Sequence, residues 1–453
     1  MRDRLFPGQK TELVRLSWPL LVETLLVMLI GNVSTILLAA FSDDAAGSIS
    51  VANQVVSVFH LVFMIISTGT GILAAQYVGA KLNEKTARLG GMAIFIAFLL
   101  GLVGTVVLLV FAETFLTWLN LEGTFLAYGR TFAMITAGGF AIQAVSFVMS
   151  QIIFSHGYTK VGMSASLLAN VVNLGVNYLL IFGVPALGIP ALGVAGAAIG
   201  GLVARLIYFS LLAIFLLRSI DVKVSFRIFR PFPKDILGDI LKVGAPAVAE
   251  NLSYTGSQLI ITSFVAAVGA IAVTTKSYYE TISMFTWATA AAVATATSIM
   301  VGHHVGAGEH PAADKIVRYC LRIAILSSLV VTGILVFTVG SIGKLFTDNP
   351  EILALLKTVV LVDLVLELAR AVNMSVGTSL KATGDTRYPL FLALIVQWAA
   401  MIPAGYLLCF TFGLGLPGIW IAIAIDEVLR SVFLFRRWRS GLWKLKTLVR
   451  RTA

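Results

Sequence analysis

The 453-residue chain is 58% hydrophobic and only 12% charged, with a mean hydropathy of +0.94. A soluble domain carries about 25% charged residues, so a water-soluble fold is excluded and a fold embedded in lipid is indicated, because lipid can solvate outward-facing apolar side chains. The formal net charge of +11 would suggest nucleic acid in a soluble protein; here it indicates basic cytoplasmic loops, and no nucleic-acid partner is expected.

Twelve apolar runs follow one another along the chain. A transmembrane helix needs about 20 mostly apolar residues. The runs cover residues 13–41, 47–78, 89–111, 126–155, 162–183, 192–217, 240–267, 272–302, 316–338, 351–380, 388–411 and 417–436. Several are longer than a bilayer is thick, which predicts tilted helices or helices that extend past the headgroups. The sequence therefore predicts an all-α integral membrane protein with twelve transmembrane helices.

The loops between these runs alternate in charge. Lys and Arg gather before the first run, in every second loop and after the last run, whereas the other loops contain one basic residue, Lys344. Basic residues in short loops mark the cytoplasmic side of a membrane protein. Both termini are therefore predicted to lie in the cytoplasm.

The two halves of the sequence repeat each other. An offset of 227 positions places Pro19 on Pro246 and Glu23 on Glu250, and the register slips by five near the end. The further matches are Val78-Gly79-Ala80 with Val305-Gly306-Ala307, Gly157 with Gly384, Thr159-Lys160 with Thr386-Arg387, and Gly193-Val194-Ala195-Gly196 with Gly415-Leu416-Pro417-Gly418. Each half has six runs, so both halves enter the membrane in the same direction. We predict an N-terminal lobe (1–217), a basic cytoplasmic linker (218–239) and a C-terminal lobe (240–453).

These residues resemble the multidrug and toxic compound extrusion (MATE) family of secondary transporters. The resemblance begins with Pro-x-x-x-Glu at Pro19 and Pro246. The other motifs are Ala52-Asn53-Gln54, Asn173, Leu192-Gly193-Val194-Ala195-Gly196-Ala197-Ala198, Val305-Gly306-Ala307-Gly308-Glu309 and Gly384-Asp385-Thr386-Arg387-Tyr388-Pro389. The resemblance implies two lobes in a V around a central cavity. It also implies a bacterial inner-membrane protein that exports organic, often cationic, compounds in exchange for protons or sodium ions.

Two positions depart from the common pattern of that family. Many members have an aspartate fifteen residues after the first proline, where this sequence has Ser34. Many sodium-coupled members have an acidic residue fifteen residues before Asp385, where this sequence has Arg370. The resemblance therefore transfers neither ion site to this chain.

Ionisable residues inside the C-terminal runs are candidates for function, because a charged side chain deep in a bilayer is costly. Asp363, Glu367, Arg370 and Asn373 are spaced by four, three and three residues and therefore share one helical face. This face is predicted to point into the cavity or toward a neighbouring helix; the alternative is a salt-bridge network that locks the lobe. Glu250, one turn after the repeat proline, is predicted to carry a proton or to pair with an organic cation.

The N-terminal half offers a second set of candidates. Glu23 is the repeat partner of Glu250 and takes the same prediction, with hydrogen bonding to backbone groups freed by the proline as the alternative. Asn170, Asn173 and Asn177 share a face of the run 162–183. They are predicted to bind an ion or ligand, or to hold neighbouring helices together by polar contacts.

The remaining embedded polar residues receive weaker predictions. Glu280 is a further candidate for the cavity, whereas nearby Lys276, Tyr278 and Tyr279 are interpreted as residues of the membrane interface. Peripheral ion pairs that fix the lobes are the interpretation for the last run of each half. These residues are Arg205, Asp426, Glu427 and Arg430.

No metal or cofactor site is expected. Cys320 and Cys409 lie in apolar runs, the five histidines form no ligand pattern, and the glycine loops of nucleotide-binding proteins are missing. The driving energy is therefore assigned to an ion gradient, with H+ favoured over Na+ as the coupling ion.

The leading functional hypothesis is an antiporter that works by alternating access, as a monomer in the lipid bilayer. Its substrate is expected to be a small organic compound, cationic or neutral and amphipathic. A flippase for a lipid-linked saccharide shares the architecture but predicts a more basic cavity. An integral-membrane enzyme would need clustered His, Asp or Ser at one interface, and because no such cluster occurs, enzymatic activity is not expected.

Overall fold

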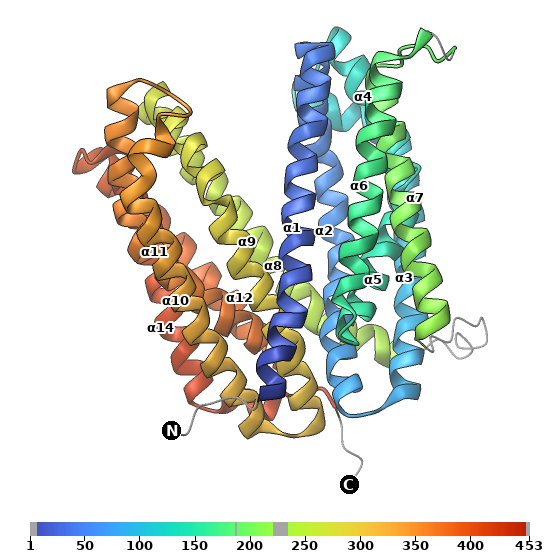
Figure 1. The fold of residues 1–453 in the computed structure, drawn as a ribbon, viewed down its shortest axis with the longest axis vertical. Coiled ribbons are helices and arrows are strands. Elements are labelled where there is room, and N and C mark those ends of the chain that lie inside the picture. The colour runs from blue at the N-terminus through green and yellow to red at the C-terminus, as the bar shows by residue number, and fades with distance from the viewer. Residues whose placement is uncertain (1–6, 186–187, 221–233, 450–453) are drawn as a thin grey trace. The chain divides into compact units, whose positions relative to one another are not determined.

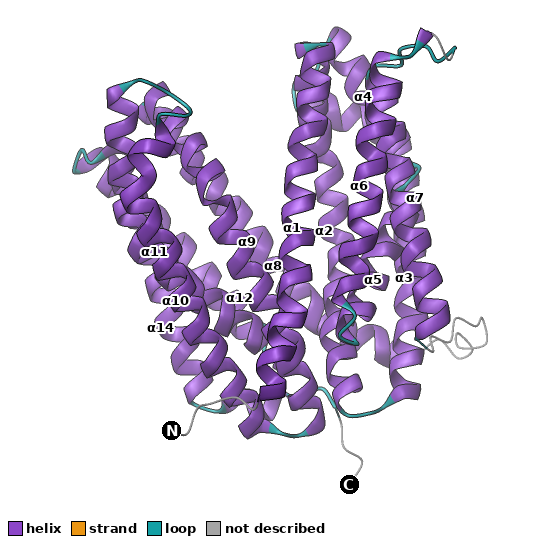
Figure 2. Ribbon diagram, viewed as in Figure 1, coloured by secondary structure: helices purple, strands orange, loops and turns teal. Residues whose placement is uncertain are grey.

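The computed structural model describes residues 7–449 except 186–187 and 221–233, and it places the backbone but not the side chains of residue 7 and residues 29–35. The described residues are helical almost throughout (Figure 2). Among them the only β-structure is an isolated bridge between Val184 and Ile189. Most of the predicted linker lies outside the described residues, as does the side chain of Ser34.

The N-terminal half forms seven of the helices labelled in Figure 1. They are α1 (Pro7–Phe41), α2 (Asp43–Gly79), α3 (Asn83–Trp118), α4 (Gly123–Ala137), α5 (Phe140–Ser155), α6 (Thr159–Phe182) and α7 (Val194–Ser219). Polar residues start α2, where Ser42 accepts a hydrogen bond from the N–H of Ala45 and two aspartates follow in the first turn.

The predicted run 126–155 is not one straight helix. It consists of α4 and α5, which meet at an angle of 53° across Gly138 and Gly139. A side chain contact stabilises the break, because the hydroxyl of Thr105 donates a hydrogen bond of 2.7 Å to the carbonyl of Ala137. Together the two helices are long and apolar enough to form one bent span.

The C-terminal half repeats this order. Its helices are α8 (Lys234–Val268), α9 (Ala270–Ala307), α10 (His310–Gly343), α11 (Pro350–Thr383), α12 (Arg387–Val396), α13 (Ile402–Tyr406) and α14 (Gly415–Arg439), followed by the short 3-10 helix η5 (Leu442–Lys446). Two π-helical segments, η3 (Gln397–Met401) and η4 (Leu407–Thr411), join α12 and α13 into one span. Pro403 lies between them and has no N–H for the helical ladder.

The predicted all-α membrane fold is confirmed. Seven helices of the described residues are long and apolar enough to cross a membrane, and the bent α4–α5 pair adds one more. Counting each joined pair once, six helical spans lie in each half at the predicted places. Large apolar side chains also point outward, as in Phe337 and Leu217, which are 89% and 75% exposed and therefore need lipid around them. The predicted V shape and central cavity concern the placement of the two halves and stay predictions.

The chain divides into two compact units. We call residues Val22–Ala245 the N-unit, and residues Met1–Leu21 together with Pro246–Ala453 the C-unit. The first part of α1 thus belongs to the C-unit, where Lys10 lies 5.7 Å from the ring centre of Tyr319. The first part of α8 belongs to the N-unit in the same way. The predicted lobe boundaries at residues 217 and 240 stay predictions.

Close backbone contacts hold the start of α8 in the N-unit. A β-carbon on Gly69 of α2 would collide with the carbonyl oxygen of Ile240, and one on Gly244 would collide with the carbonyl oxygen of Ile65. Only residues without a side chain allow two helices to approach this closely. The two glycines therefore fix α8 against α2.

The internal repeat is visible in the local backbone structure. Lys81 and Gly308 both end a helix with positive φ, 58° and 78°, and Gly157 and Gly384 do so with 83° and 96°. The hydrogen bonds around these turns also match. Tyr158 N–H donates to the carbonyl of Ile153 at 3.2 Å, and in the second half Asp385 N–H donates to Leu380 at 3.0 Å. The 227-residue offset is thus a structural register as well as a sequence register.

Candidate functional site

The polar face of α11 lies in the interior of the C-unit. Asp363 and Glu367 are 1% and 2% exposed, and Asn373 is 7% exposed. This face is covered by neighbouring helices, since α11 packs against α9, α10 and α14. The four residues that the sequence placed on one helical face therefore lie together, away from the lipid-facing surface of the unit.

Arg370 joins the acids of α11 to those of α14. Its guanidinium donates a hydrogen bond to Glu367 on the same helix, and its Nε lies 3.4 Å from Oε1 of Glu427. Asn373 donates to the side chain of Glu427 and to its carbonyl oxygen, the latter at 3.2 Å. Glu427 thus accepts hydrogen bonds from two residues of the neighbouring helix.

Arg430 extends the network along α14. It contacts both oxygens of Asp426, at 3.0 Å from Nε to Oδ1 and 2.7 Å from Nη2 to Oδ2. Its Nη2 also lies 3.3 Å from Oε1 of Glu427. Asp426, Glu427 and Arg430, interpreted from the sequence as peripheral pairs, are buried and belong to the same network as the acids of α11. We call the six ionisable residues the C-unit cluster: Asp363, Glu367, Arg370, Asp426, Glu427 and Arg430.

The C-unit cluster contains more acids than bases. Its four carboxyls face two guanidiniums, so two negative charges would remain if every group were ionised. Asp363 differs from the other acids because it accepts its hydrogen bond from a neutral hydroxyl, that of Tyr279 on α9. The cluster therefore has room for a proton or a cation, and Asp363 is the carboxyl with the weakest compensation.

Tyr279 lies in the interior of the C-unit. Its interpretation as a membrane-interface residue is wrong, because it is 7% exposed and packs edge-on against Trp420 at 4.9 Å between ring centres. No pattern around Tyr279 in the sequence indicated this contact, because α9 and α14 are distant from each other in the sequence.

Glu250 and Glu23 lie in different surroundings. In the C-unit, Oε2 of Glu250 forms an ion pair of 3.1 Å with Nζ of Lys381. In the N-unit, Oε1 of Glu23 accepts a hydrogen bond of 3.1 Å from the hydroxyl of Tyr208. The buried Oε2 of Glu23 has no hydrogen-bond partner within the described part of the chain. Lys381 and Tyr208 were not among the predicted residues.

The three asparagines of α6 contact one another or their own helix. Asn177 donates a hydrogen bond of 3.2 Å to Asn173, and Asn170 donates one of the same length to Ser166. A β-carbon on Gly200 of α7 would collide with the side chain of Asn177. These contacts fit the alternative that the sequence left open, polar contacts between helices.

Glu280 lies on the surface. Its side chain is 58% exposed and forms an ion pair with Lys276 one turn earlier on α9. The structure therefore does not place it with the buried acids of the C-unit.

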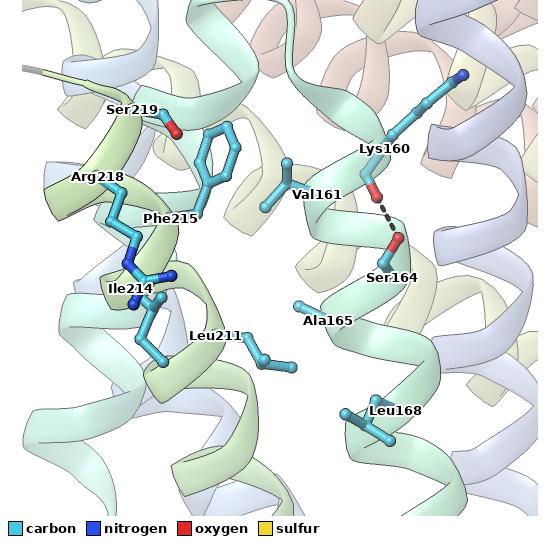
Figure 3. Close-up of a pocket in the computed structure, with 10 residues that line it drawn as sticks. All are labelled: Lys160, Val161, Ser164, Ala165, Leu168, Leu211, Ile214, Phe215, Arg218 and Ser219. Atoms are coloured by element: carbon cyan, nitrogen blue, oxygen red, sulfur yellow. Dashed lines mark hydrogen bonds between the residues drawn. The ribbon is translucent and has the colours of Figure 1, made fainter.

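A cavity of about 470 Å³ lies between α6 and α7 in the N-unit (Figure 3). Its walls are mostly apolar, and the basic residues Lys160 and Arg218 stand near one end. The other lining residues are Val161, Ser164, Ala165, Leu168, Leu211, Ile214, Phe215 and Ser219. In Figure 3 the amino group of Lys160 points away from the cavity, and Ser164 bonds the carbonyl of Lys160 at 2.8 Å. None of the predicted site residues lines this cavity, so the candidate site is the set of buried acids.

Comparison with known proteins identifies the family. The MatE family model matches residues 19–179 and then residues 246–407, so one match falls on each half of the repeat. The chain belongs to the MATE family. Each match begins at the proline that precedes Glu23 or Glu250, which shows that the repeat is the family's own structural unit.

Relatives of this MATE protein are transporters. It is 33% identical to the uncharacterized transporter YisQ of Bacillus subtilis, over 96% of each chain. It is 24% identical to the probable multidrug resistance protein NorM of Thermotoga maritima, over 98% of this chain and 95% of NorM. The predicted family is thus confirmed, and the chain is a multi-pass membrane transporter.

Solved MATE structures share the fold. A crystal structure of MATE in the bent conformation superposes with a TM-score of 0.88 at 22% identity, over 96% of both chains. A MATE transporter of Vibrio cholerae gives a TM-score of 0.88 at 17% identity, over 96% of this chain and 97% of the other. These similarities show the fold.

Proposed function

We propose that this MATE transporter is a secondary active antiporter that exports small organic compounds in exchange for protons, with sodium as the alternative ion. It works by alternating access as a monomer in the bacterial inner membrane, with both termini in the cytoplasm and without a cofactor. Relatives named as probable multidrug resistance proteins support export of organic compounds. The alternating basic loops of the sequence support the orientation.

One observation carries the coupling proposal: buried carboxyls outnumber buried cations. A carboxylate without a counter-charge in a low-dielectric interior is strongly destabilising, so Asp363 and Glu23, which hydrogen-bond to tyrosines, favour a bound proton or cation. Binding at such a group shifts a conformational equilibrium if the two conformations differ in affinity for the ion. Gradient energy can enter the cycle at this point.

The same charge excess indicates the cargo. An interior with surplus negative charge attracts organic cations and tolerates neutral amphipathic compounds, whereas it repels anions. Cationic or neutral amphipathic compounds are therefore the expected substrates.

Transport in proteoliposomes tests the proposal. Purified protein is reconstituted, proton and sodium gradients are imposed separately, and movement of the organic cation ethidium is followed by fluorescence. We expect transport driven by a proton gradient and a loss of about tenfold or more in Asp363→Asn, with the exposed Glu280→Gln as the matched control. No ethidium movement with either gradient, together with no gradient-dependent movement of other organic cations, would contradict the antiport proposal.

A further inference from the structure

The internal repeat provides a comparison between two equivalent carboxyls. Glu23 and Glu250 each follow the repeat proline by one turn, and the matching turns at Gly157 and Gly384 fix the register of the neighbouring helices. In the slipped register near the end, Gly193 corresponds to Gly415, with φ of 53° and 57°. The surroundings of the two carboxyls can thus be compared position by position.

In the C-unit, Glu250 has a cation as its direct partner. Lys381 of α11 pairs with it at 3.1 Å, and the guanidinium of Arg430 on α14, which binds Asp426 and Glu427, adds a weaker attraction. Both side chains of the ion pair are largely buried, with 16% of Glu250 and 19% of Lys381 exposed. The negative charge of Glu250 is therefore compensated by a cation of the protein itself.

The N-unit has neutral residues at both equivalent positions. Phe154 of α5 corresponds to Lys381, and Tyr208 of α7 corresponds to Arg430. A β-carbon on Gly162 of α6 would lie 3.0 Å from Oε2 of Glu23 and would collide with the ring of Phe154, so these two side chains meet over that glycine. Glu23 thus faces a phenyl ring and a phenol where Glu250 faces an ammonium and a guanidinium.

The N-unit also has no equivalent of the rest of the ionic face. The residues equivalent to Asp363, Glu367, Arg370 and Asn373 are neutral, and three of them are buried. They are Thr136, Phe140, Gln143 and Ser146. The ionisable side chains on α5, α6 and α7 are Lys160, Tyr178, Arg205, Tyr208 and Arg218. Of these, Tyr208 donates a hydrogen bond to Oε1 of Glu23, and Oε2 of Glu23 has no hydrogen-bond partner within the described residues. The difference between the halves is therefore systematic.

We propose that Glu23 is the group of the N-unit that exchanges a coupling proton and that Glu250 is its immobilised counterpart, a fixed ion pair that positions α8 against α11. This assignment rests on the proposed antiport and names its ion and its site. The Glu23 carboxylate takes a proton from water on one side of the membrane and returns it to water on the other, while Tyr208 keeps its hydrogen and donates to Oε1. Binding of a proton and binding of an organic cation exclude each other at this carboxyl.

The repeat itself supplies the decisive variant. Phe154→Lys gives Glu23 the cation that Glu250 has, and is expected to hold Glu23 permanently ionised. Glu23→Gln removes the exchangeable proton, and Glu250→Gln removes the fixed pair. Tyr158→Lys adds the same charge four residues later, at an exposed position after the end of α5, and serves as the control.

Infrared difference spectra on a pH jump, recorded on the purified full-length protein without cargo, detect protonated carboxyls by their C=O stretch. We expect part of this band to disappear in Glu23→Gln and in Phe154→Lys, and to persist in Glu250→Gln and Tyr158→Lys. A band that is unchanged in Glu23→Gln would overturn the assignment.

Ethidium transport in proteoliposomes gives the second measurement. We expect proton-driven transport to fall about tenfold or more in Glu23→Gln and Phe154→Lys, and to stay within twofold of wild type in Tyr158→Lys, roughly the scatter of a surface change. Full proton coupling in Phe154→Lys would refute the proposal. Absent transport in the wild type would instead remove the antiport, whereas the infrared band would still decide whether Glu23 exchanges protons.

Discussion

The contacts of single residues show which buried charges are structural. Arg430 bonds Asp426 and Glu427, and these two acids are 1% and 3% exposed. Arg370 donates hydrogen bonds to Glu427 and Glu367, both of them different from the Asp426 that Arg430 holds. The stability of the C-unit therefore depends on Arg430 more than on any exposed pair.

Arg430→Gln is expected to lower the free energy of unfolding by about 3–5 kcal/mol, because it leaves buried acids without their cation. The matched control is Arg130→Gln, since Arg130 and its partner Glu113 are 54% and 59% exposed at 3.6 Å; its effect should stay below about 1 kcal/mol. Thermal unfolding of the purified variants in detergent measures both. Equal melting temperatures of the two variants would show that the C-unit cluster does not stabilise the fold.

The sequence predicted which residues share a helix face but not which helix that face meets. The spacing of Asp363, Glu367, Arg370 and Asn373 was sufficient to place them together, because side chains repeat every 3.6 residues along a helix. Their partners Tyr279 and Glu427 come from α9 and α14, and no periodicity within one helix encodes that choice. The same limit hid Tyr208 as the partner of Glu23.

At the scale of the element, glycines decide how closely two helices approach. On α7, Gly200 faces α6, where an added β-carbon would collide with Asn177, whereas the next residue, Gly201, has open space around its α-carbon. The two positions lie in the same helix and differ in what they face. Substitutions at these two positions therefore distinguish the effect of helix packing from the effect of intrinsic helix propensity.

Gly200→Ala is expected to destabilise the protein, because the new methyl group must push α6 and α7 apart or displace Asn177. Gly201→Ala should instead stabilise it by about 0.5–1 kcal/mol, since alanine replaces glycine in a helix interior without a clash. Melting temperatures in the same detergent give the sign of each effect. The packing argument fails if both substitutions shift the melting temperature in the same direction.

Helix positions were predictable because hydropathy detects the part of a helix that lies in lipid. Helix ends were less predictable, because polar residues continue a helix beyond the bilayer. The helix α10 runs from His310 to Gly343, whereas the predicted run covers 316–338. The break at Gly138 and Gly139 was also missed. Two adjacent glycines inside an apolar run were its signal, since glycine weakens a helix interior.

For the whole molecule, the predicted orientation is open to a direct test. Leu345, after α10, and Leu445, after α14, are 83% and 81% exposed, and the predicted topology places them on opposite sides of the membrane. The native thiols Cys320 and Cys409 are buried, so they should not interfere with labelling.

A membrane-impermeant maleimide is expected to label Leu345→Cys in intact cells and Leu445→Cys only after permeabilisation. The reason is that the loop around Leu345 belongs to the set that has one basic residue, whereas the segment around Leu445 is rich in Arg and Lys. Labelling is read from a mass shift on a gel. The reverse pattern would invert the topology and, with it, the proposed direction of transport.

The first segment of α8 packs in the N-unit, and this has a consequence for the order in which the protein folds. Gly69 of α2 is synthesised early. Its packing partner, the backbone of Ile240, leaves the ribosome only after more than half of the chain has been translated. Until then Gly69 lacks the backbone that packs against it. The N-unit therefore completes its packing only after the start of α8, which belongs to this unit, has been synthesised.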